Sequence, residues 1–589
     1  MNLSVFTNMK SRSFFVLAAF GGMVLGIGSS LSAFGGAALG AAPKKCIGLC
    51  FDVMNTTPSN VLANADQFAA NAPYLDGIAI GLHGIPAMAE DGNVVTSQYR
   101  YIMHKSHRWT RDAVKGQLPY LKEIAKRPNL KESFLLFWMT PHGKSERIDW
   151  RDDKGWANYA ENMANVAWLA KAAGLKGLML DPEEYGAQGG RLPQFVHTHE
   201  DPPYREAAQL ARQRGREVFS RVFKEFPDAV IFSLWFMSKF DFWLEDGYQP
   251  HPLQNTEQSG ELLQYFLNGI LDVIPIEARI VDGYEYYTGS ALKNDYFRKE
   301  TIITTSALPL VAPENVTKYR AQVYSGNAHY LDMYAQKANP KSLWYYGPVN
   351  GSRLEHLRLN MEQSFRTATE YVWLYGERSG KLFNWRDGHY EKQKTWEEAI
   401  PGFTETVMLA KDPCRFAAKR KAAFAKRGEL ANLAKDAQKM SLGVSTKDWP
   451  KPPVYDRRNR RTNVKRFEKS LVTSGLNPGD LYSVGLSIKR SGPGFLFIFP
   501  RFRGKGEEIK SPMYIPAIAT KDLREDNVWQ PGEVVVRVPE GADELYLQIK
   551  AEITNDATEI ELGDFKVYKI GDPLPVWPAE FERPHERKR

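Results

Sequence analysis

Short apolar segments alternate with amphipathic helical stretches between residue 46 and about residue 380, and this alternation constrains the fold more than any other feature of the chain. Such alternation is typical of repeated strand–helix units that build a parallel sheet. Eight strands with helices between them predict a closed (β/α)8 barrel, the TIM barrel, over residues 43–410. The eight segments are 46–52, 75–83, 134–139, 177–181, 229–236, 280–285, 342–346 and 371–377.

The helical stretches between these segments have recognisable ends. Gly174 follows the stretch at 156–173 as a stop signal, and Pro227 ends the stretch at 205–226. Further helices are expected at 262–270, 313–339 and 354–369. An open doubly wound sheet is the alternative fold, but the first segment leads into Asp52 and Val53 and not into a glycine-rich phosphate turn, which disfavours a dinucleotide-binding fold.

The first 42 residues have the pattern of a secretory signal peptide. Lys10 and Arg12 precede an apolar run at 14–39, and small residues follow it at 40–42. We expect cleavage here, a secreted or periplasmic protein, and no stable membrane span after cleavage. The apolar run is also long enough for an uncleaved anchor, which is the alternative.

The last third of the chain has a different sequence pattern. Residues 411–465 predict a helix at 413–440 followed by a basic, proline-containing linker. From 466 to 575, short alternating segments separated by turn signals predict an all-β, jelly-roll-like sandwich, and residues 576–589 form a basic tail.

Net charge bears on the expected binding partners, and cysteine content bears on the expected disulfides. The net charge of +8 arises mostly in the last third, where basic runs could favour an anionic polymer; a solvated linker and tail is the simpler interpretation. We expect no nucleic-acid partner. The three cysteines, Cys46, Cys50 and Cys414, cannot make a disulfide framework, and we expect buried thiols.

Carboxylates stand at the ends of three predicted strands. Asp181 and Glu183 follow the fourth segment, Glu285 ends the sixth and Glu377 ends the eighth. The carboxyl ends of barrel strands hold the active site in this fold, and glycoside hydrolysis needs two carboxyl groups that flank one bond. Because side chains alternate along a strand, Asp181 and Glu183 should face the same way. We predict that these four acids are catalytic; ion pairs around the rim are the structural alternative.

Aromatic and polar residues gather at the same strand ends. Aromatic faces can stack on the C–H surfaces of sugars, although large rings can also simply fill a barrel. No H-E-x-x-H spacing appears, so we predict no metal site, and we expect no organic cofactor. The residues predicted to contact substrate are Asp52, His83, Trp138, His142, Glu184, Tyr185, Trp235, Tyr284, Tyr286, Trp344, Tyr346, Trp373 and Tyr375.

With these strand ends, and with the motif at 476–482 in the sandwich, the chain resembles the TIM-barrel glycoside hydrolases that carry a module similar to carbohydrate-binding modules. The resemblance implies one of three site arrangements. In α-galactosidase-like or α-fucosidase-like barrels, Asp181 would be the nucleophile and Glu285 a plausible acid/base. In chitinase-like barrels, Glu183 would be the acid and Asp181 would orient an acetamido group, although Met179 stands where chitinases have another Asp. The cellulase-like arrangement would require Glu377 to take over a role, because the fourth segment has no Asn-Glu pair.

The sequence therefore predicts a secreted glycoside hydrolase that cleaves an extracellular poly- or oligosaccharide by a two-carboxylate mechanism. The alternatives are a non-catalytic glycan-binding surface protein on the same scaffold, or a polysaccharide lyase. No Gly-x-Ser-x-Gly elbow supports an esterase. The sandwich could bind glycan through exposed aromatics such as Trp529 or Tyr514, or could only support the barrel.

Overall fold

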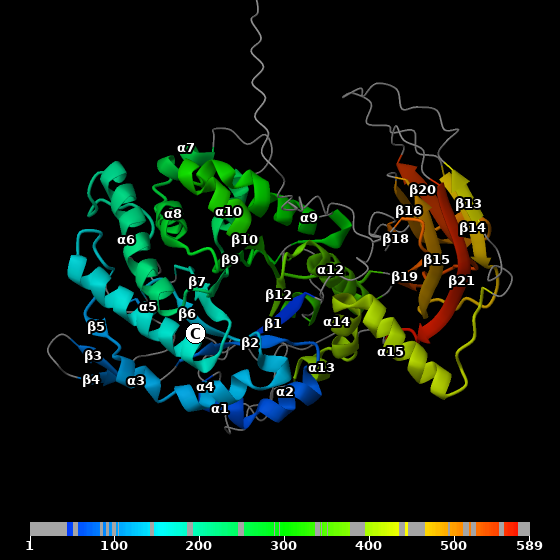
Figure 1. Ribbon diagram of the computed structural model, residues 1–589, viewed down its shortest axis with the longest axis horizontal. Coiled ribbons are helices and arrows are strands. Elements are labelled where there is room, and N and C mark those ends of the chain that lie inside the picture. The colour runs from blue at the N-terminus through cyan, green and yellow to red at the C-terminus, as the bar shows by residue number, and fades with distance from the viewer. Residues whose placement is uncertain are drawn as a thin grey trace, which may run out of the picture. The chain divides into compact units, whose positions relative to one another are not determined.

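A computed structural model provides the structure of the protein, and Figure 1 shows its course. The predicted signal peptide, the basic tail, Asp52, His83, His142, Tyr185, Glu377 and Tyr514 lie outside the residues that it describes. The described residues are 44–50, 57–82, 86–89, 94–96, 102–103, 105–141, 147–184, 192–244, 252–287, 289–293, 295–335, 342, 344–349, 352–376, 395–434, 442–445, 466–492, 495–509, 518–519, 526–552 and 559–574.

A parallel sheet forms the centre of the larger part of the chain (Figure 1). Its strands follow the order β10-β9-β8-β7-β6-β2-β1-β12-β11. Seven of them coincide with predicted segments, which confirms those predictions. The strands are β1 (Lys45–Cys50), β2 (Gly77–Gly81), β6 (Phe134–Trp138), β7 (Gly177–Asp181), β8 (Val230–Ser233), β9 (Arg279–Asp282), β10 (Val323–Ser325), β11 (Asn327–Tyr330) and β12 (Tyr371–Gly376).

One interrupted strand joins the two ends of this sheet. β10 pairs with β9 and β11 pairs with β12, and only Gly326 separates β10 from β11. The Gly326 amide donates to the carbonyl of Asp282 at 2.7 Å, and a Cβ at position 326 would lie 3.1 Å from the Cα of Gly283. Glycine therefore lets the chain pass close to β9 as it changes partner. The result is a TIM-like barrel with eight positions, not an open doubly wound sheet.

The seventh strand was placed wrongly by the sequence. Among residues 342–346, the described positions 342 and 344–346 form no strand, and the seventh position belongs to 323–330, inside the stretch predicted as a helix at 313–339. Small polar side chains replace the expected apolar ones: the Ser325 hydroxyl donates to the carbonyl of Thr367 at 3.1 Å, and the Asn327 amide donates to the carbonyl of Ser364 at 3.2 Å. These bonds to α12 (Arg353–Thr367) hold a buried strand whose sequence has few apolar residues.

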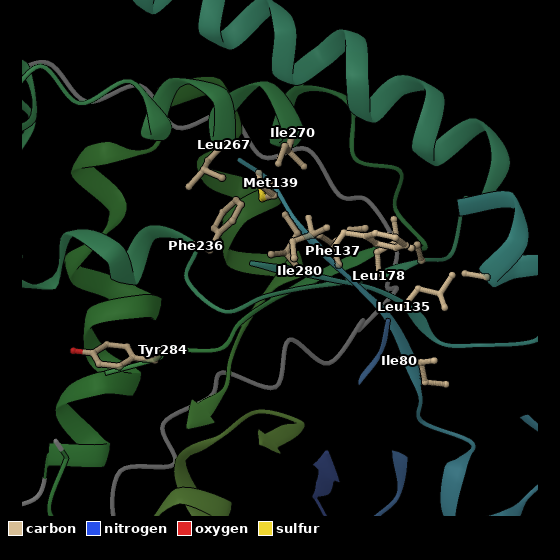
Figure 2. Packing of buried hydrophobic residues seen from close by; sticks show 14 of the residues in the cluster. Ile80, Leu135, Phe137, Met139, Leu178, Phe236, Leu267, Ile270, Ile280 and Tyr284 are labelled. Atoms are coloured by element: carbon tan, nitrogen blue, oxygen red, sulfur yellow. The ribbon is translucent and has the colours of Figure 1, made fainter. Parts of the chain in front are cut away.

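Two apolar layers line the two faces of the sheet. Side chains such as Met179, Phe232 and Trp373 fill the barrel interior. Their neighbours on the opposite face pack against the surrounding helices, as Leu178 and Ile280 do beside Ile270 of α8 in Figure 2. Burial on both faces explains the nearly continuous apolar runs that revealed the strands.

Helices surround the barrel at the predicted places. Asp152 caps α5 by accepting from the Gly155 amide at 2.9 Å, and Gly174 ends this helix with φ of 80°. The helices that confirm predicted stretches are α5 (Asp153–Ala173), α6 (Tyr204–Glu225), α8 (Leu263–Val273) and α12 (Arg353–Thr367). The other α-helices of the described residues are α1 (Pro58–Ala63), α2 (Ala65–Asn71), α3 (Arg111–Lys115), α4 (Leu118–Ala125), α7 (Pro252–Gln258), α9 (Asp295–Thr301), α10 (Val316–Gln322), α11 (Asp332–Ala335), α13 (Trp396–Ala399), α14 (Phe403–Lys411) and α15 (Pro413–Lys426).

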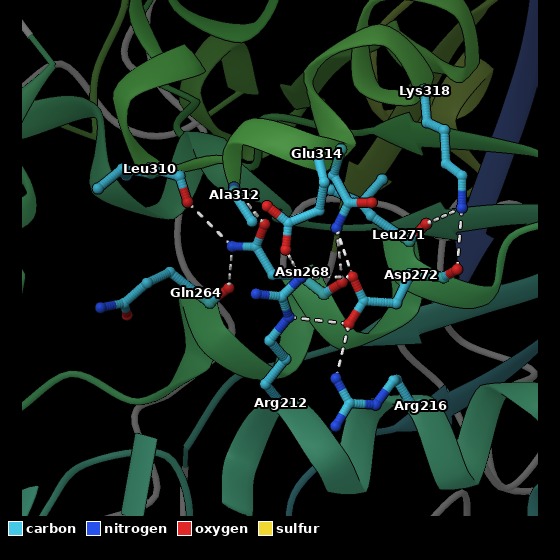
Figure 3. Close-up of polar contacts among 11 residues, drawn as sticks. Arg212, Arg216, Gln264, Asn268, Leu271, Asp272, Leu310, Ala312, Glu314 and Lys318 are labelled. Carbon is cyan, nitrogen blue, oxygen red and sulfur yellow. Dashed lines mark hydrogen bonds and ion pairs between the residues drawn. The ribbon is translucent and has the colours of Figure 1, made fainter. Parts of the chain in front are cut away.

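A polar network ties α6 and α8 to the 3-10 turn at Pro313–Asn315 (Figure 3). Arg212 donates to both oxygens of Asp272 at 2.8 and 2.6 Å, and Arg216 donates to the same carboxylate at 3.0 Å. Arg212 also bonds Glu314 at 2.5 Å, and Asn315 bonds Asp272 at 2.6 Å. Asp272 therefore links three elements at the amino end of β9.

The C-terminal part consists of two antiparallel sheets. One has the order β13-β21-β15-β19, and the other has β14-β20-β16-β17, with β18 beside β16. Both sheets contribute to one apolar core, which contains Val484, Leu547 and Leu562. The strands are β13 (Leu442–Ser445), β14 (Arg466–Val472), β15 (Leu481–Ser491), β16 (Phe495–Gly504), β17 (Glu507–Glu508), β18 (Ile518–Ala519), β19 (Gln530–Arg537), β20 (Glu544–Glu552) and β21 (Glu559–Gly571).

Two details differ from the predicted organisation. β13 pairs with β21, although its residues fall within the segment predicted as a linker. The helix predicted at 413–440 ends at Lys426, because Gly428 adopts φ of 72° and turns the chain.

Cys46 and Cys414 are free thiols. Burial raises the pKa of the Cys414 thiol to about 11. Among the helices of the described residues, none is long and apolar enough to cross a membrane.

Candidate active site

Asp181 and Glu183 share one turn at the carboxyl end of β7. Asp181 is buried and pairs in register with Trp138 of β6. Its carboxylate accepts a hydrogen bond from the Glu183 amide at 2.9 Å. The alternation of side chains puts Asp181 on the same face as Met179, which lies in the barrel interior. Asp181 thus fixes the backbone that carries Glu183 at the mouth of the barrel.

Glu285 meets Tyr287 in the turn after β9. The tyrosine hydroxyl donates to the Glu285 carboxylate at 2.8 Å, and both residues are largely buried. Burial raises the pKa of Tyr287 well above its usual value, and the negative charges of Glu285 and Glu183 raise it further. The charge of Glu183, which follows β7, thus acts on the same phenol that donates to Glu285, which follows β9.

Four aromatic side chains pack around this phenol. Together with Tyr287, they form what we call the mouth cluster: Tyr287, Tyr330, Trp344, Trp373 and Tyr375. The rings of Tyr287 and Tyr375 stack with centroids 6.0 Å apart, and those of Tyr330 and Tyr375 stack at 5.3 Å. Trp344 packs edge-on against Tyr330 at 5.7 Å and leaves 48% of its surface exposed. The cluster thus extends from a solvent-facing indole to the buried Glu285–Tyr287 pair.

A second aromatic pair lies on the β8 side of the same turn. The rings of Trp235 and Tyr286 lie 5.7 Å apart, and the Tyr286 hydroxyl donates to the carbonyl of Lys239 at 3.1 Å. Within the described part of the chain, the Trp235 indole N–H has no hydrogen-bond partner. Trp235 is partly buried, and its indole nitrogen is inaccessible to solvent.

Glu184 belongs to a charged group next to this pair. Its carboxylate accepts from the Phe195 amide at 2.7 Å. Burial raises the pKa of Glu184, and the positive charge of Lys239 opposes that rise. Lys239 also lies 3.5 Å from the Glu261 carboxylate. The contacts of Glu184 thus hold it to the segment at 194–195.

Three of the predicted contact residues support the framework. Tyr284 is buried in the layer between the sheet and the helices, and its hydroxyl donates to Asp241 at 3.0 Å. The Tyr346 hydroxyl donates to the carbonyl of Gly289 at 2.7 Å. Trp373 is fully buried inside the barrel, and its indole donates to the carbonyl of Gly283 at 2.9 Å. All three hold the segment that follows β9.

Asp282, the last residue of β9, also has a structural role. It is fully buried, and burial raises its pKa to about 6, although hydrogen bonds from the amide and hydroxyl of Ser238 oppose that rise. Ser238 lies in the 3-10 segment Met237–Trp243, so Asp282 anchors this segment to β9. It faces away from the barrel mouth.

Sequence reasoning missed Tyr287 and Tyr330. Tyr287 follows two predicted contact residues, but the alternation of a strand cannot be extended into the turn that begins at Gly283. Tyr330 lies in the strand that we had interpreted as a helix. Within the described residues, no group of three His, Cys, Asp or Glu side chains is arranged to hold a metal ion.

Comparisons with known proteins yield only distant likenesses. No family model matches the chain, and the curated proteins give no match. Among solved structures, a glucosidase from Croceicoccus marinus is 12% identical over 76% of this chain and 83% of that chain, with a TM-score of 0.30. A 3-keto-D-glucoside 4-epimerase from E. coli is 11% identical over 62% and 98%, also with a TM-score of 0.30.

Shorter likenesses involve 18–22% of this chain. The Clostridium thermocellum endo-1,4-β-D-xylanase 10B, a structure of CBM22-1 and GH10 modules, is 17% identical over 18% of this chain, with a TM-score of 0.13. This match spans 19% of the xylanase structure. Another match, to the bacteriophage CBA120 tailspike protein 4 domain, spans only 18% of that domain. At such scores these likenesses carry no argument about activity, which has to come from the residues of the site.

Proposed function

We propose that this protein is a carbohydrate-active enzyme that hydrolyses glycosidic bonds at the mouth of the barrel. The proposal rests on two glutamates that follow neighbouring barrel strands, Glu183 after β7 and Glu285 after β9: Glu285 accepts a hydrogen bond from Tyr287, and the charge of Glu183 raises the pKa of the same tyrosine. Two carboxyl groups beside an aromatic surface are the equipment that glycoside hydrolysis needs.

In this mechanism Glu285 is the ionised group and Glu183 is the protonated one. The hydrogen bond from Tyr287 stabilises Glu285 as a carboxylate. Glu183, whose backbone amide is held by Asp181, is assigned the role of the acid. Glu183 gives this proton to the glycosidic oxygen as the bond to the anomeric carbon breaks. Glu285 either bonds that carbon as the leaving group departs, after which water deprotonated by Glu183 breaks the new ester with net retention of configuration, or deprotonates the attacking water, which inverts the configuration.

The mouth cluster supplies the sugar-binding surface in this proposal. Trp344 and Tyr375 can stack on the apolar face of one sugar unit, while Trp235 and Tyr286 offer a second platform across the turn. Substrate that spans both platforms would place its linkage over Glu285. We therefore favour an oligo- or polysaccharide over a single sugar, and the predicted signal peptide makes an extracellular one the natural substrate.

The test is release of reducing ends by the mature protein, prepared without residues 1–42, from a panel of neutral, amino, sulfated and uronate-bearing polysaccharides. Glu183→Gln and Glu285→Gln should each abolish release, and Glu184→Gln should retain it because Glu184 is bonded to the Phe195 amide. Wild-type activity that survives both changes would overturn the assignment. New unsaturated ends in the product would identify a lyase instead.

A second candidate, a non-catalytic glycan-binding protein, is favoured by one observation in the C-terminal sheets. Ile498 and Phe502 of β16 face the core, so Phe497 and Phe499 face outward, and their rings stack at 6.1 Å. Retained binding of a neutral polysaccharide, without release of reducing ends from any member of the panel, would support this candidate. Loss of that binding in Phe499→Ala would place it on the outer face of β16.

A further inference from the structure

A lysine is buried behind the turn that carries Glu285. Lys299 lies on α9 and is only 4% exposed. Its ammonium donates to the carbonyl of Tyr286 at 2.5 Å. It also lies 4.8 Å from the ring centroid of Tyr284 and 5.2 Å from that of Tyr296. One cation therefore contacts the backbone and a side chain of the residues on either side of Glu285.

The turn needs such support because its backbone is strained. Tyr284 adopts φ of 45°, in the left-handed region that residues other than glycine rarely adopt. The Tyr284 hydroxyl bonds Asp241, and the carbonyl of Tyr287 accepts from the Tyr346 hydroxyl at 3.1 Å. Lys299 acts between these two anchors, at Tyr286.

Charged and titratable groups surround this lysine on three elements. Burial lowers the pKa of Lys299 to about 7; Asp295 of α9 and Asp241 of the 3-10 segment raise it, and Arg298 of α9 lowers it. His329 of β11 faces the same space, and burial together with the charge of Lys299 lowers its pKa to about 3. His329 is therefore neutral near pH 7, and Lys299 supplies the cation that contacts the turn.

We propose that Lys299 is a positioning residue for the reaction: its ammonium holds the Tyr284–Tyr287 turn so that Glu285 and Tyr287 meet at the barrel mouth. This inference rests on the proposed function. A neutral amine keeps a hydrogen bond to Tyr286 but loses its charge toward the carbonyl and the two rings.

The charge of Lys299 lowers folding stability, although it supports the turn. The pKa of Lys299 is lower in the folded protein than the usual lysine value near 10.4, so the unfolded chain binds this proton more tightly. Folding stability from this group therefore rises with pH between about 7 and 10.4. Below about pH 7 the buried charge of Lys299 therefore costs folding stability.

The experiment compares Lys299→Met with Lys318→Met in the full-length protein. Lys318 also donates to backbone carbonyls, those of Leu271 and Asp272, but at the other end of the barrel (Figure 3). At pH 6 we expect Lys299→Met to lower kcat by about 10- to 100-fold with little change in KM, because misplacing a reacting group by about 1 Å has effects of this size. The deficit should shrink toward pH 9, where the wild-type lysine is neutral.

Lys318→Met should keep wild-type kcat at every pH, and the Tm of Lys299→Met at pH 6 should stay within about 3 °C of the wild-type value. An unchanged kcat in Lys299→Met would overturn the inference. So would a deficit that is constant across pH and accompanied by a large fall in Tm, since that is the behaviour of a lysine needed only for folding.

Hydrogen exchange separates this inference from the proposed function. If the wild-type protein cleaves no glycan, hydrolysis is wrong, but amides at 283–289 should still exchange faster in Lys299→Met than in the wild type at pH 6. Exchange that is equal in the two proteins would overturn the positioning role even if the wild type is an active hydrolase.

Discussion

The two ends of the barrel use acidic residues in opposite ways. At the amino end, carboxylates meet lysine and arginine: Glu132 lies 3.7 Å from Lys45 and 3.5 Å from Lys176, and Glu370 takes two hydrogen bonds from Arg279. At the carboxyl end, Asp181 accepts from the Glu183 amide and Glu285 accepts from the Tyr287 phenol, which are neutral donors, while Glu184 is affected by the charge of Lys239.

The difference teaches what each end contributes. A carboxylate paired with a cation is held ionised and takes no part in proton exchange near neutral pH. A hydrogen bond from a phenol or an amide orients a carboxylate without adding a positive charge, and a second acid nearby can hold a proton. We interpret the amino end as the part that stabilises the barrel and the carboxyl end as the part that reacts, and four predictions test this division.

The largest effect is expected from a matched pair of Glu→Gln changes. Glu285→Gln should lower kcat by about 10³-fold or more with little change in Tm, since a general acid or base contributes about 10²–10⁴-fold. Glu132→Gln should keep kcat within about twofold and lower Tm by a few degrees, because Lys45, Lys176 and Tyr371 lose their charged partner. Steady-state kinetics and calorimetry on both variants check this, and equal losses of kcat would break the division.

Asp272→Asn should give the next effect, on stability alone. Burial by itself would raise the pKa of Asp272, but hydrogen bonds from Arg212, Asn315 and Arg216 hold it below its usual value. The stability that this group contributes is therefore present above pH 4 and is lost as the pH falls through the lowered pKa. We expect Asp272→Asn to cost about 1–3 kcal/mol at pH 7 and much less near pH 2. Urea unfolding at both pH values measures it, and a gap that does not change with pH would contradict the prediction.

A matched pair of Tyr→Phe changes sharpens the comparison. Both Tyr287 and Tyr371 donate a hydroxyl to a glutamate, at 2.8 and 2.9 Å, but at opposite ends of the barrel. Tyr287→Phe should lower kcat about tenfold, because one hydrogen bond to a charged group is worth about 1.5–3 kcal/mol. Tyr371→Phe should leave kcat unchanged. The comparison fails if initial rates with saturating substrate fall equally in both variants.

Glu370→Gln should give the smallest effect. Arg279 and Glu370 are each about a quarter exposed, so we expect a loss of about 0.5–1 kcal/mol in unfolding free energy that decreases at high salt, with kcat unchanged. Urea unfolding at two salt concentrations, with kinetics at the lower one, measures both parts. A fall in kcat would show that the amino end influences the reaction.

Most of the barrel could be predicted because buried parallel strands leave a continuous apolar signal, as 134–138 and 177–181 do. The seventh strand could not, since Ser325, Asn327 and His329 replace apolar residues and are satisfied by a helix or buried without a charge. Its stability comes from contacts with residues about 40 positions later in the chain, which local patterns do not contain.

The acids of the site could be named from sequence because they directly follow strands. Their partners could not. Tyr287 reaches Glu285 only because the turn after β9 passes through a positive φ at Tyr284, and Lys299 reaches that turn from a separate helix. A turn conformation and a contact between elements both depend on tertiary structure, so neither can be inferred from spacing.

The pairing of β1 with β12 has a consequence for the time during which the protein is made. Lys44 bonds the carbonyl of Thr369, 325 residues further along the chain. At roughly 5–20 residues per second, a ribosome needs about 15–65 s to produce that distance. For all of this time the first strand has a neighbour on one side only, and an uncovered strand edge can pair with another chain. The last strand of the barrel therefore removes a hazard that exists from the moment the first strand is complete.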